Sequence, residues 1–178
     1  KREFIAWKKN DMIGFAPHIV KRKTIVDYAS VNNIKVLVET GSCHGDMINA
    51  MLPYFDKLYS IELYDELYNE CVVRFKNIDK VTLLHGDSTN KLYDVMNELD
   101  KPAIFWLDGH YSGEGTAKGE KETPIIEELN CILRKRNPYD VILIDDARCF
   151  GSFPDYPSII NLCNYIRSIA PDAKIEIK

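Results

Sequence analysis

Residues 36–45 read VLVETGSCHG, and this stretch decides the fold. The stretch from Ile34 to Val38 is apolar except for Lys35 and rich in β-branched residues, which is typical of a strand that is covered on both faces, as strands of a parallel sheet are. Gly41 and Gly45 follow it, and glycine permits a sharp turn and a close approach of a ligand to the backbone. The stretch therefore predicts a buried strand that turns into a helix at a nucleotide-type binding site.

Glu39 stands between this strand and the glycines. The spacing Gly-x-x-x-Gly differs from the Gly-x-Gly-x-x-Gly pattern that holds a dinucleotide pyrophosphate. An ordinary strand-turn-helix corner is the alternative interpretation of the turn taken alone.

Apolar stretches that alternate with helical patterns indicate the rest of the architecture. Strands that alternate with helices form a parallel sheet covered on both faces, so we expect a Rossmann-like, doubly wound α/β fold. We expect one domain over residues 1–178, with a helical N-terminal segment at 1–33 and the core at 34–178. The further strands are predicted at 58–63, 81–84, 102–107, 141–144 and 174–178, and the helices at 18–29, 46–52, 67–75, 90–99, 125–133 and 158–169.

Polar side chains follow the second and third predicted strands. Glu62 comes about 20 positions after Gly41, the interval at which an acidic residue meets a ribose diol in nucleotide-binding folds. The alternative is a glutamate that faces solvent at the end of a strand. Asp87 and Ser88 follow the third strand, where they would also serve as N-caps of the next helix.

Three carboxylates follow the fourth and fifth predicted strands. Asp108 comes after one strand, and Asp145 with Asp146 comes after the other. Carboxylate oxygens at this edge suit a hard divalent cation such as Mg²⁺ or Mn²⁺. The alternative is that each aspartate caps the turn or helix that follows it.

Composition excludes several classes of protein. The net charge of −4 provides no basic field for nucleic acid, and the clusters Lys21–Lys23 and Arg134–Arg136 are expected at solvated helix ends. The five cysteines are odd in number and read as buried free thiols of a reducing compartment, which favours a cytoplasmic location. No apolar run approaches the ~20 residues of a membrane span.

The start without methionine suggests a piece of a longer protein, with further domains such as glycosyltransferases as candidate fusion partners.

The glycine turn resembles the first motif of class I S-adenosylmethionine-dependent methyltransferases. This resemblance implies that Glu39 lies near the methionine ammonium and that the turn contacts the cofactor through Gly41, Ser42 and Gly45. It implies that Glu62 binds the ribose, and that Asp87 accepts a hydrogen bond from the adenine amine with Ser88 beside it. Such enzymes have a seven-stranded sheet, and this sequence stops where the seventh strand would come.

Two further segments resemble the metal-dependent O-methyltransferases of the catechol and macrolide-sugar types. They are LDGH at 107–110 and LIDDA at 143–147, and the resemblance covers residues 34–151. It implies that Asp108, which also borders the cofactor, binds the cation together with Asp145 and Asp146. The catechol enzymes use a lysine as base at the position of Tyr111, so His110 is the candidate base here.

The resemblance implies transfer of a methyl group to a sugar or glycan hydroxyl with the help of Mn²⁺ or Mg²⁺. His110 and the long polar segment 112–122 favour a sugar over a catechol or small phenol, which remains open. A glycan-binding module without catalysis is a second alternative, with Tyr111, Phe150, Phe153 and Tyr156 as stacking surfaces. An NAD-dependent oxidoreductase is the third, because Glu62 would serve its ribose equally well.

Overall fold

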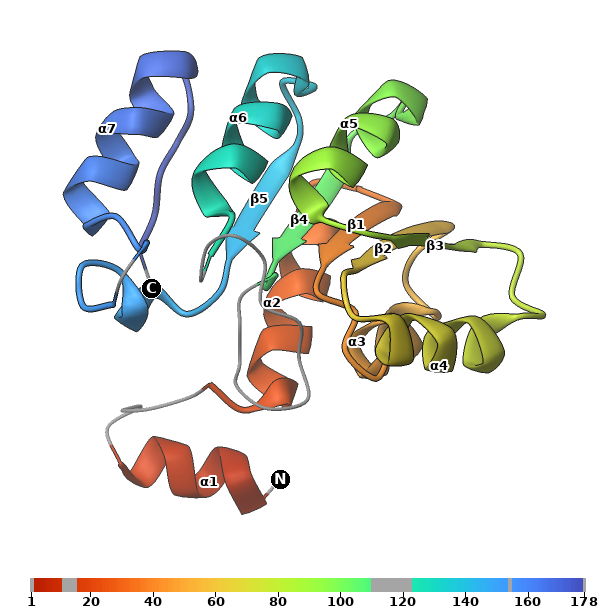
Figure 1. The fold of residues 1–178 in the computed structure, drawn as a ribbon. Helices are drawn as coiled ribbons and strands as arrows, with labels where there is room; N and C mark the ends of the chain where they lie inside the picture. The colour runs from red at the N-terminus through yellow and green to blue at the C-terminus, as the bar shows by residue number, and fades with distance from the viewer. Residues whose placement is uncertain (1, 11–15, 110–122, 154, 178) are drawn as a thin grey trace.

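The computed structural model of the chain describes residues 2–10, 16–109, 123–153 and 155–177. Within these residues, five parallel strands form one sheet in the order β3-β2-β1-β4-β5 (Figure 1). The direction of winding reverses between β1 and β4, and in open α/β sheets such a reversal opens a crevice for ligands at the carboxyl ends of the strands. The strands are β1 (Val36–Thr40), β2 (Lys57–Glu62), β3 (Val81–His85), β4 (Ala103–Leu107) and β5 (Val141–Ile144).

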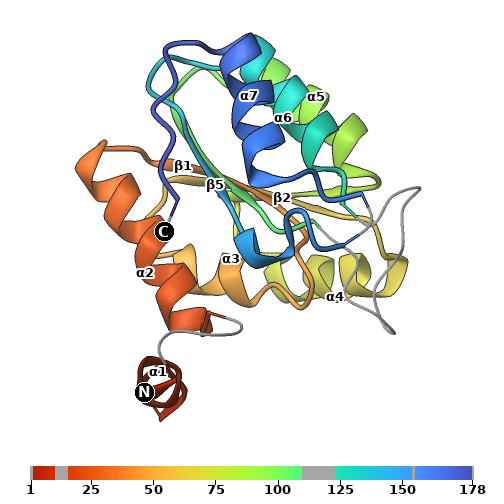
Figure 2. The same ribbon diagram turned by 90° about the vertical axis from the view of Figure 1, so that its left-hand side faces the viewer.

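Helices cover both faces of the sheet, as Figure 2 shows edge-on. Helices α5, α6 and α7 lie on one face, and α2, α3 and α4 lie on the other, while α1 lies beyond the start of α2 and away from the sheet. The helices are α1 (Arg2–Lys9), α2 (His18–Val31), α3 (Asp46–Met51), α4 (Asp65–Phe75), α5 (Ser88–Glu98), α6 (Ile125–Lys135) and α7 (Ile159–Ile169), with a 3₁₀ turn at Ala147–Cys149.

The two central strands supply the core on both sides. Successive side chains of a strand point to opposite faces. Val38 and Phe105 therefore pack toward α5, α6 and α7, whereas Leu37 and Trp106 pack toward α2, α3 and α4. Every residue of β1 and β4 is buried, which explains why these strands lack polar alternation in the sequence.

The predicted fold class is confirmed, and the ends of the predicted helices and first five strands differ from the structure by two residues at most. The sixth strand, predicted at 174–178, is wrong over the residues described, because 174–177 pair with no strand. This segment instead contacts α2, where Tyr28 Oη donates to Glu176 Oε2 at 3.0 Å. No helix of the described part is long and apolar enough to cross a membrane.

Candidate functional site

The carboxyl ends of β1, β4 and β5 meet at one edge of the sheet. Backbone hydrogen bonds continue past the strands: Asp108 N donates to Thr40 O at 3.2 Å, and Asp145 N donates to Leu107 O at 3.1 Å. The first bond fixes the residue after β4 beside the end of β1, where the glycine turn begins, and the second fixes the residue after β5 beside the end of β4. The sequence prediction that these segments share one edge is therefore confirmed.

Both glycines of the turn are required by close packing within the protein. Gly41 has φ +85°, and a Cβ added there would lie 2.7 Å from the carbonyl oxygen of Asp108. Gly45 has φ +75°, and a Cβ added there would lie 2.5 Å from the ring of Phe75. The turn thus packs against β4 on one side and α4 on the other, a constraint beyond the ligand contact expected from the sequence.

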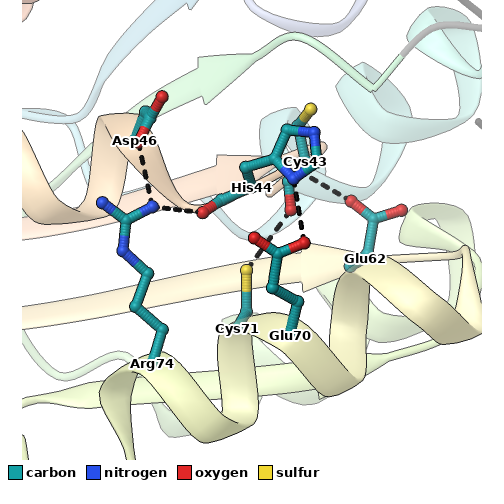
Figure 3. A network of polar contacts seen from close by, with 7 residues as sticks. All are labelled: Cys43, His44, Asp46, Glu62, Glu70, Cys71 and Arg74. Atoms are coloured by element: carbon teal, nitrogen blue, oxygen red, sulfur yellow. Dashed lines mark hydrogen bonds and ion pairs between the residues drawn. The ribbon is translucent and has the colours of Figure 1, made fainter.

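Glu62, at the end of β2, uses one carboxylate oxygen to hold the glycine turn, as Figure 3 shows, and the other to accept from the backbone at the start of α4. Oε2 accepts from Cys43 N at 2.8 Å, and Oε1 accepts from Tyr64 N at 2.9 Å. The residue is buried, so the alternative of a solvent-facing glutamate is wrong. A carboxylate offers about four lone-pair sites, so two remain to accept from a ribose diol.

Helix α4 clamps the same turn from outside, as Figure 3 shows. Cys71 Sγ donates to the carbonyl oxygen of Cys43 at 3.3 Å, and His44 Nδ1 lies 2.9 Å from Glu70 Oε2. Arg74 donates to the carbonyl oxygen of His44 and, at 2.9 Å, to Oδ1 of Asp46. These contacts hold the turn in one shape without a ligand, and a preformed site loses less entropy on binding.

Glu39 is a buried carboxyl group at the carboxyl end of β1. Ser60 Oγ donates to its Oε2 at 2.7 Å, and the Ser42 and Ser60 hydroxyls are 2.6 Å apart. Since Ser60 donates its only hydroxyl hydrogen to Glu39, Ser42 must donate to Ser60. Burial raises the pKa of Glu39 to about 8; the bond from Ser60 lowers it, while the charges of Asp108 and Glu62 raise it further. A cation beside Glu39 would reverse this effect.

Asp87 caps helix α5, as its alternative interpretation predicted. Its Oδ1 accepts from Thr89 N at 2.8 Å and from Thr89 Oγ1 at 2.6 Å. Gly86 N donates to the carbonyl oxygen of Glu62 at 2.9 Å, which places this corner next to the end of β2. The predicted contacts of Asp87 and Ser88 with adenine therefore stay predictions.

Lys21 of α2 joins the two strand ends that carry Asp108 and Asp145. Its Nζ lies 3.5 Å from Asp108 Oδ2 and forms a closer ion pair with Asp145 Oδ2. Only 14% of its side chain is exposed, so the expectation of a solvated Lys21 is wrong. Burial alone would lower the pKa of Lys21, but the carboxylates of Asp108 and Asp145 raise it overall. Burial and the Asp145 carboxylate raise the pKa of Asp108 to about 7, although the positive charge of Lys21 acts to lower it.

Asp146, the residue after Asp145, forms an ion pair with a different cation. Its backbone is left-handed, with φ +57° and ψ +40°, and its Oδ1 lies 2.6 Å from Nη1 of Arg148. Among the residues that the structure describes, no group of three or more His, Cys, Asp and Glu side chains could hold a metal ion. In this arrangement Asp108, Asp145 and Asp146 do not fit the predicted divalent cation. His110 and Tyr111 lie outside the described residues.

Glu128 is a site residue that sequence reasoning missed. It is fully buried on α6, and a Cβ added at Gly109 would lie 3.2 Å from its Oε1 and 3.1 Å from Thr40 Oγ1. Burial raises the pKa of Glu128 to about 7, although the Ser88 and Thr40 side chains act in the opposite direction. A carboxyl group thus stands directly behind the segment that follows β4.

The aromatic residues near the end of β5 pack against one another. The rings of Phe150 and Tyr156 meet edge to face at 5.3 Å between centroids, and those of Phe153 and Tyr156 lie 6.4 Å apart. Phe150 is buried in the core beside α7. Its ring is therefore not available for stacking on a sugar, which weakens the interpretation as a glycan-binding module.

The arrangement resembles solved methyltransferase structures. The O-methyltransferase TomG from Streptomyces achromogenes, solved in complex with SAM, superposes with a TM-score of 0.56 over 96% of this chain and 74% of TomG, at 16% identity. The SAH-bound methyltransferase PaMTH1 from Podospora anserina gives a TM-score of 0.56 over 86% of this chain and 65% of its own, at 15% identity. A putative caffeoyl-CoA O-methyltransferase from Staphylococcus aureus gives 0.54 over 96% and 78%, at 12% identity.

These likenesses establish the fold. No protein-family model matches the sequence, and no curated protein sequence matches it. The chain has the fold of class I S-adenosylmethionine-dependent methyltransferases, as the glycine turn predicted.

Proposed function

We propose that this chain is an S-adenosylmethionine-dependent O-methyltransferase. The observation that carries the proposal is the pair of buried carboxylates, Glu39 and Glu62, on either side of a preformed glycine turn at the switch point of the sheet. The reaction class is supported by TomG, an O-methyltransferase solved with SAM, and by the putative caffeoyl-CoA O-methyltransferase, both with TM-scores above 0.5.

The chemistry of the buried carboxylates fits the cofactor. Glu39 is ionised with difficulty because it is buried near two other acidic residues, and the ammonium of a methionine moiety would supply the missing positive charge. Glu62 keeps acceptor sites for both ribose hydroxyls. Asp87 and Ser88 would contact the adenine, while Gly41, Ser42 and Gly45 would line the methionine side. When bound, S-adenosylmethionine supplies an electrophilic methyl group on a positively charged sulfur.

A hydroxyl of a sugar or glycan is the acceptor we propose. The support is His110, which would be the base that removes the hydroxyl proton, together with the long polar segment 112–122. The segments 107–110 and 143–147 resemble O-methyltransferases of both the catechol and the macrolide-sugar types. A positioned base of this kind contributes about 10²–10⁴-fold to the rate. A cytoplasmic location and a fusion to further domains belong to the same proposal.

The divalent cation is a separate hypothesis. The described carboxylates are paired with Lys21 and Arg148 and do not fit a metal in this arrangement. No step of the reaction is therefore assigned to a metal.

Isothermal titration with S-adenosylhomocysteine and with NAD tests the proposal. We expect S-adenosylhomocysteine to bind and NAD not to bind, because the turn lacks the middle glycine of the dinucleotide pattern. Glu62→Ala should weaken binding, whereas Glu70→Ala, which changes an exposed glutamate of the same clamp, should have a small effect. Binding of NAD alone would favour the oxidoreductase, and binding of neither would favour the glycan-binding module.

A further inference from the structure

The position predicted for a metal contains an ammonium group. Lys21 Nζ lies within ion-pair distance of Asp108 and Asp145, the two aspartates that directly follow the neighbouring strands β4 and β5. Helix α2 packs against both β4 and β5, so the lysine enters from the face of the sheet that α3 and α4 also cover. Nζ also lies 5.9 Å from the ring centroid of Trp106, within the range of a cation–π contact.

The chain supplies as much positive charge here as a divalent cation would. Asp108, Asp145 and Asp146 carry three negative charges when ionised, and Lys21 with Arg148 contributes two positive charges. A metal ion would need to lie about 2.0–2.6 Å from carboxylate oxygens. Lys21 already contacts the facing oxygens of Asp108 and Asp145, so a metal at that place would have to displace it.

This group is next to the cofactor turn. The carbonyl oxygen of Asp108 is the atom nearest to a Cβ added at Gly41, at 2.7 Å. An ammonium has three N–H donors and no acceptor, and among the described residues the carboxylates of Asp108 and Asp145 are the ion-pair partners of Lys21. A third N–H remains for an oxygen that approaches this edge.

We propose that Lys21 is the cation of the acceptor site, where its ammonium, held by Asp108 and Asp145, donates to the acceptor oxygen in place of a divalent metal. The inference rests on the proposed methyltransferase function. In the transfer, an electron pair of the acceptor oxygen forms the O–C bond, and the pair of the C–S bond returns to sulfur. The hydroxyl proton passes to the base or to water, and the products are a methyl ether and S-adenosylhomocysteine.

The ammonium group of a lysine binds a methyl acceptor differently from a metal ion. A metal ion with open positions favours two neighbouring oxygens of one ligand, such as a catechol or a vicinal diol, whereas an ammonium donates one hydrogen bond per N–H. The acceptor therefore needs one suitably placed hydroxyl and no neighbouring one.

The first test uses Mn²⁺ as the probe. Electron paramagnetic resonance of Mn²⁺ should show only the free ion when the parent protein is added, with or without S-adenosylhomocysteine. Binding of Mn²⁺ by the parent that disappears in Asp145→Asn would overturn the inference, because the aspartates would then hold a metal despite Lys21. This arm requires no variant of Lys21, so a folding defect cannot obscure it.

The second test compares Lys21→Met with Lys23→Met. Lys23 lies on the same helix, is exposed and forms an ion pair with Asp27 one turn further on, so it is a matched control for the loss of one positive charge. Circular dichroism and thermal unfolding establish that each variant is folded, and Lys21→Arg keeps the charge if the methionine variant is not. We expect all folded variants to bind S-adenosylhomocysteine within about twofold of the parent, because Lys21 acts on the acceptor.

Methyl transfer is then measured as S-adenosylhomocysteine released with a panel of monosaccharides, including monohydroxy derivatives, in EDTA or in Mn²⁺. The inference predicts equal turnover in both, a loss of about 10²-fold or more in kcat for Lys21→Met, and parent-like kcat for Lys23→Met. Turnover that requires Mn²⁺, or a Lys21→Met variant as fast as the parent, would refute it. Failure of the parent to bind S-adenosylhomocysteine would instead count against the proposed function.

Discussion

The affinity for S-adenosylhomocysteine should rise with pH because Glu39 must lose a proton to bind the methionine ammonium. In the free protein, burial raises the pKa of Glu39 to about 8, so at pH 6 about one Glu39 in a hundred is ionised. An opposite charge at hydrogen-bonding distance lowers a carboxyl pKa by about 1–3 units. The complex therefore keeps Glu39 ionised to a lower pH than the free protein does.

The magnitude follows from these two pKa values. With a pKa of about 8 in the free protein and a value lower by about 1–3 units in the complex, the affinity increases about 5- to 50-fold between pH 6 and pH 8. This range corresponds to about 1–2 kcal/mol of binding free energy. The sign is fixed, because a group that releases a proton on binding weakens the complex as the pH falls.

Isothermal titration at pH 6, 7 and 8, in two buffers that differ in ionisation enthalpy, measures both the affinity and the proton released. Glu39→Gln is the control, since its amide keeps the shape and does not titrate in this range. The variant distinguishes the pH dependence due to Glu39 from any due to Asp108, whose pKa is raised to about 7 by burial and by Asp145. Equal affinity of the parent protein at pH 6 and pH 8, without proton release, would refute the assignment of Glu39 to the ammonium.

Three further predictions concern the turn and the buried carboxyls. Glu62→Ala should weaken S-adenosylhomocysteine binding by about 1–3 kcal/mol in calorimetry, and an affinity equal to that of the parent would remove Glu62 from the site. Gly41→Val should lower the melting temperature as well as the affinity, because its side chain would meet the backbone of Asp108; an unchanged melting temperature would contradict this packing. Glu128 has its pKa raised by burial from 4.5 to about 7, so its stabilising effect, complete below pH 4.5, is lost as the pH rises through 7. In urea unfolding at pH 8, Glu128→Gln should be more stable than the parent by up to about 3 kcal/mol, and a less stable variant would show that the ionised group is well paired.

The sequence predicted the sheet well because burial on both faces removes polar residues from whole strands. β4 is apolar throughout, and β1 is apolar apart from Glu39 and Thr40; both strands are fully buried, and the sequence located each of them to within two residues. Glu39 and Glu62 could be assigned to the edge because each stands at the end of such a strand. The strand predicted at 174–178 is wrong because alternating side chains indicate a strand only where a neighbouring strand can pair with the segment.

Lys21 and Glu128 were missed because each is a charged residue on the buried stripe of a helix. Lys21 stands one turn before Ile25, which is buried with Ala29 one turn further on. Glu128 likewise stands three residues after Ile125 on the buried face of α6. Positions three and four apart share one face of a helix, so a charged residue in such a series must meet a partner from elsewhere in the fold. The spacing in the sequence can show that a charged residue lies on the buried face of a helix, but only the tertiary structure identifies its partner.

The motifs predicted a metal because they contain the carboxylates of this edge but not the lysine that pairs with them. The segments at 107–110 and 143–147 specify which carboxylates reach the edge of the sheet, and carboxylates alone imply a cation without saying which. The resemblance begins at residue 34, so helix α2 was assigned to an N-terminal segment outside the core. In the fold, α2 packs on β4 and β5 and brings Lys21 to Asp108 and Asp145. Because these aspartates are mostly buried, removing their cation would leave like charges without compensation. The helix therefore belongs to the site, and a boundary at residue 33 would separate the carboxylates from the charge that balances them.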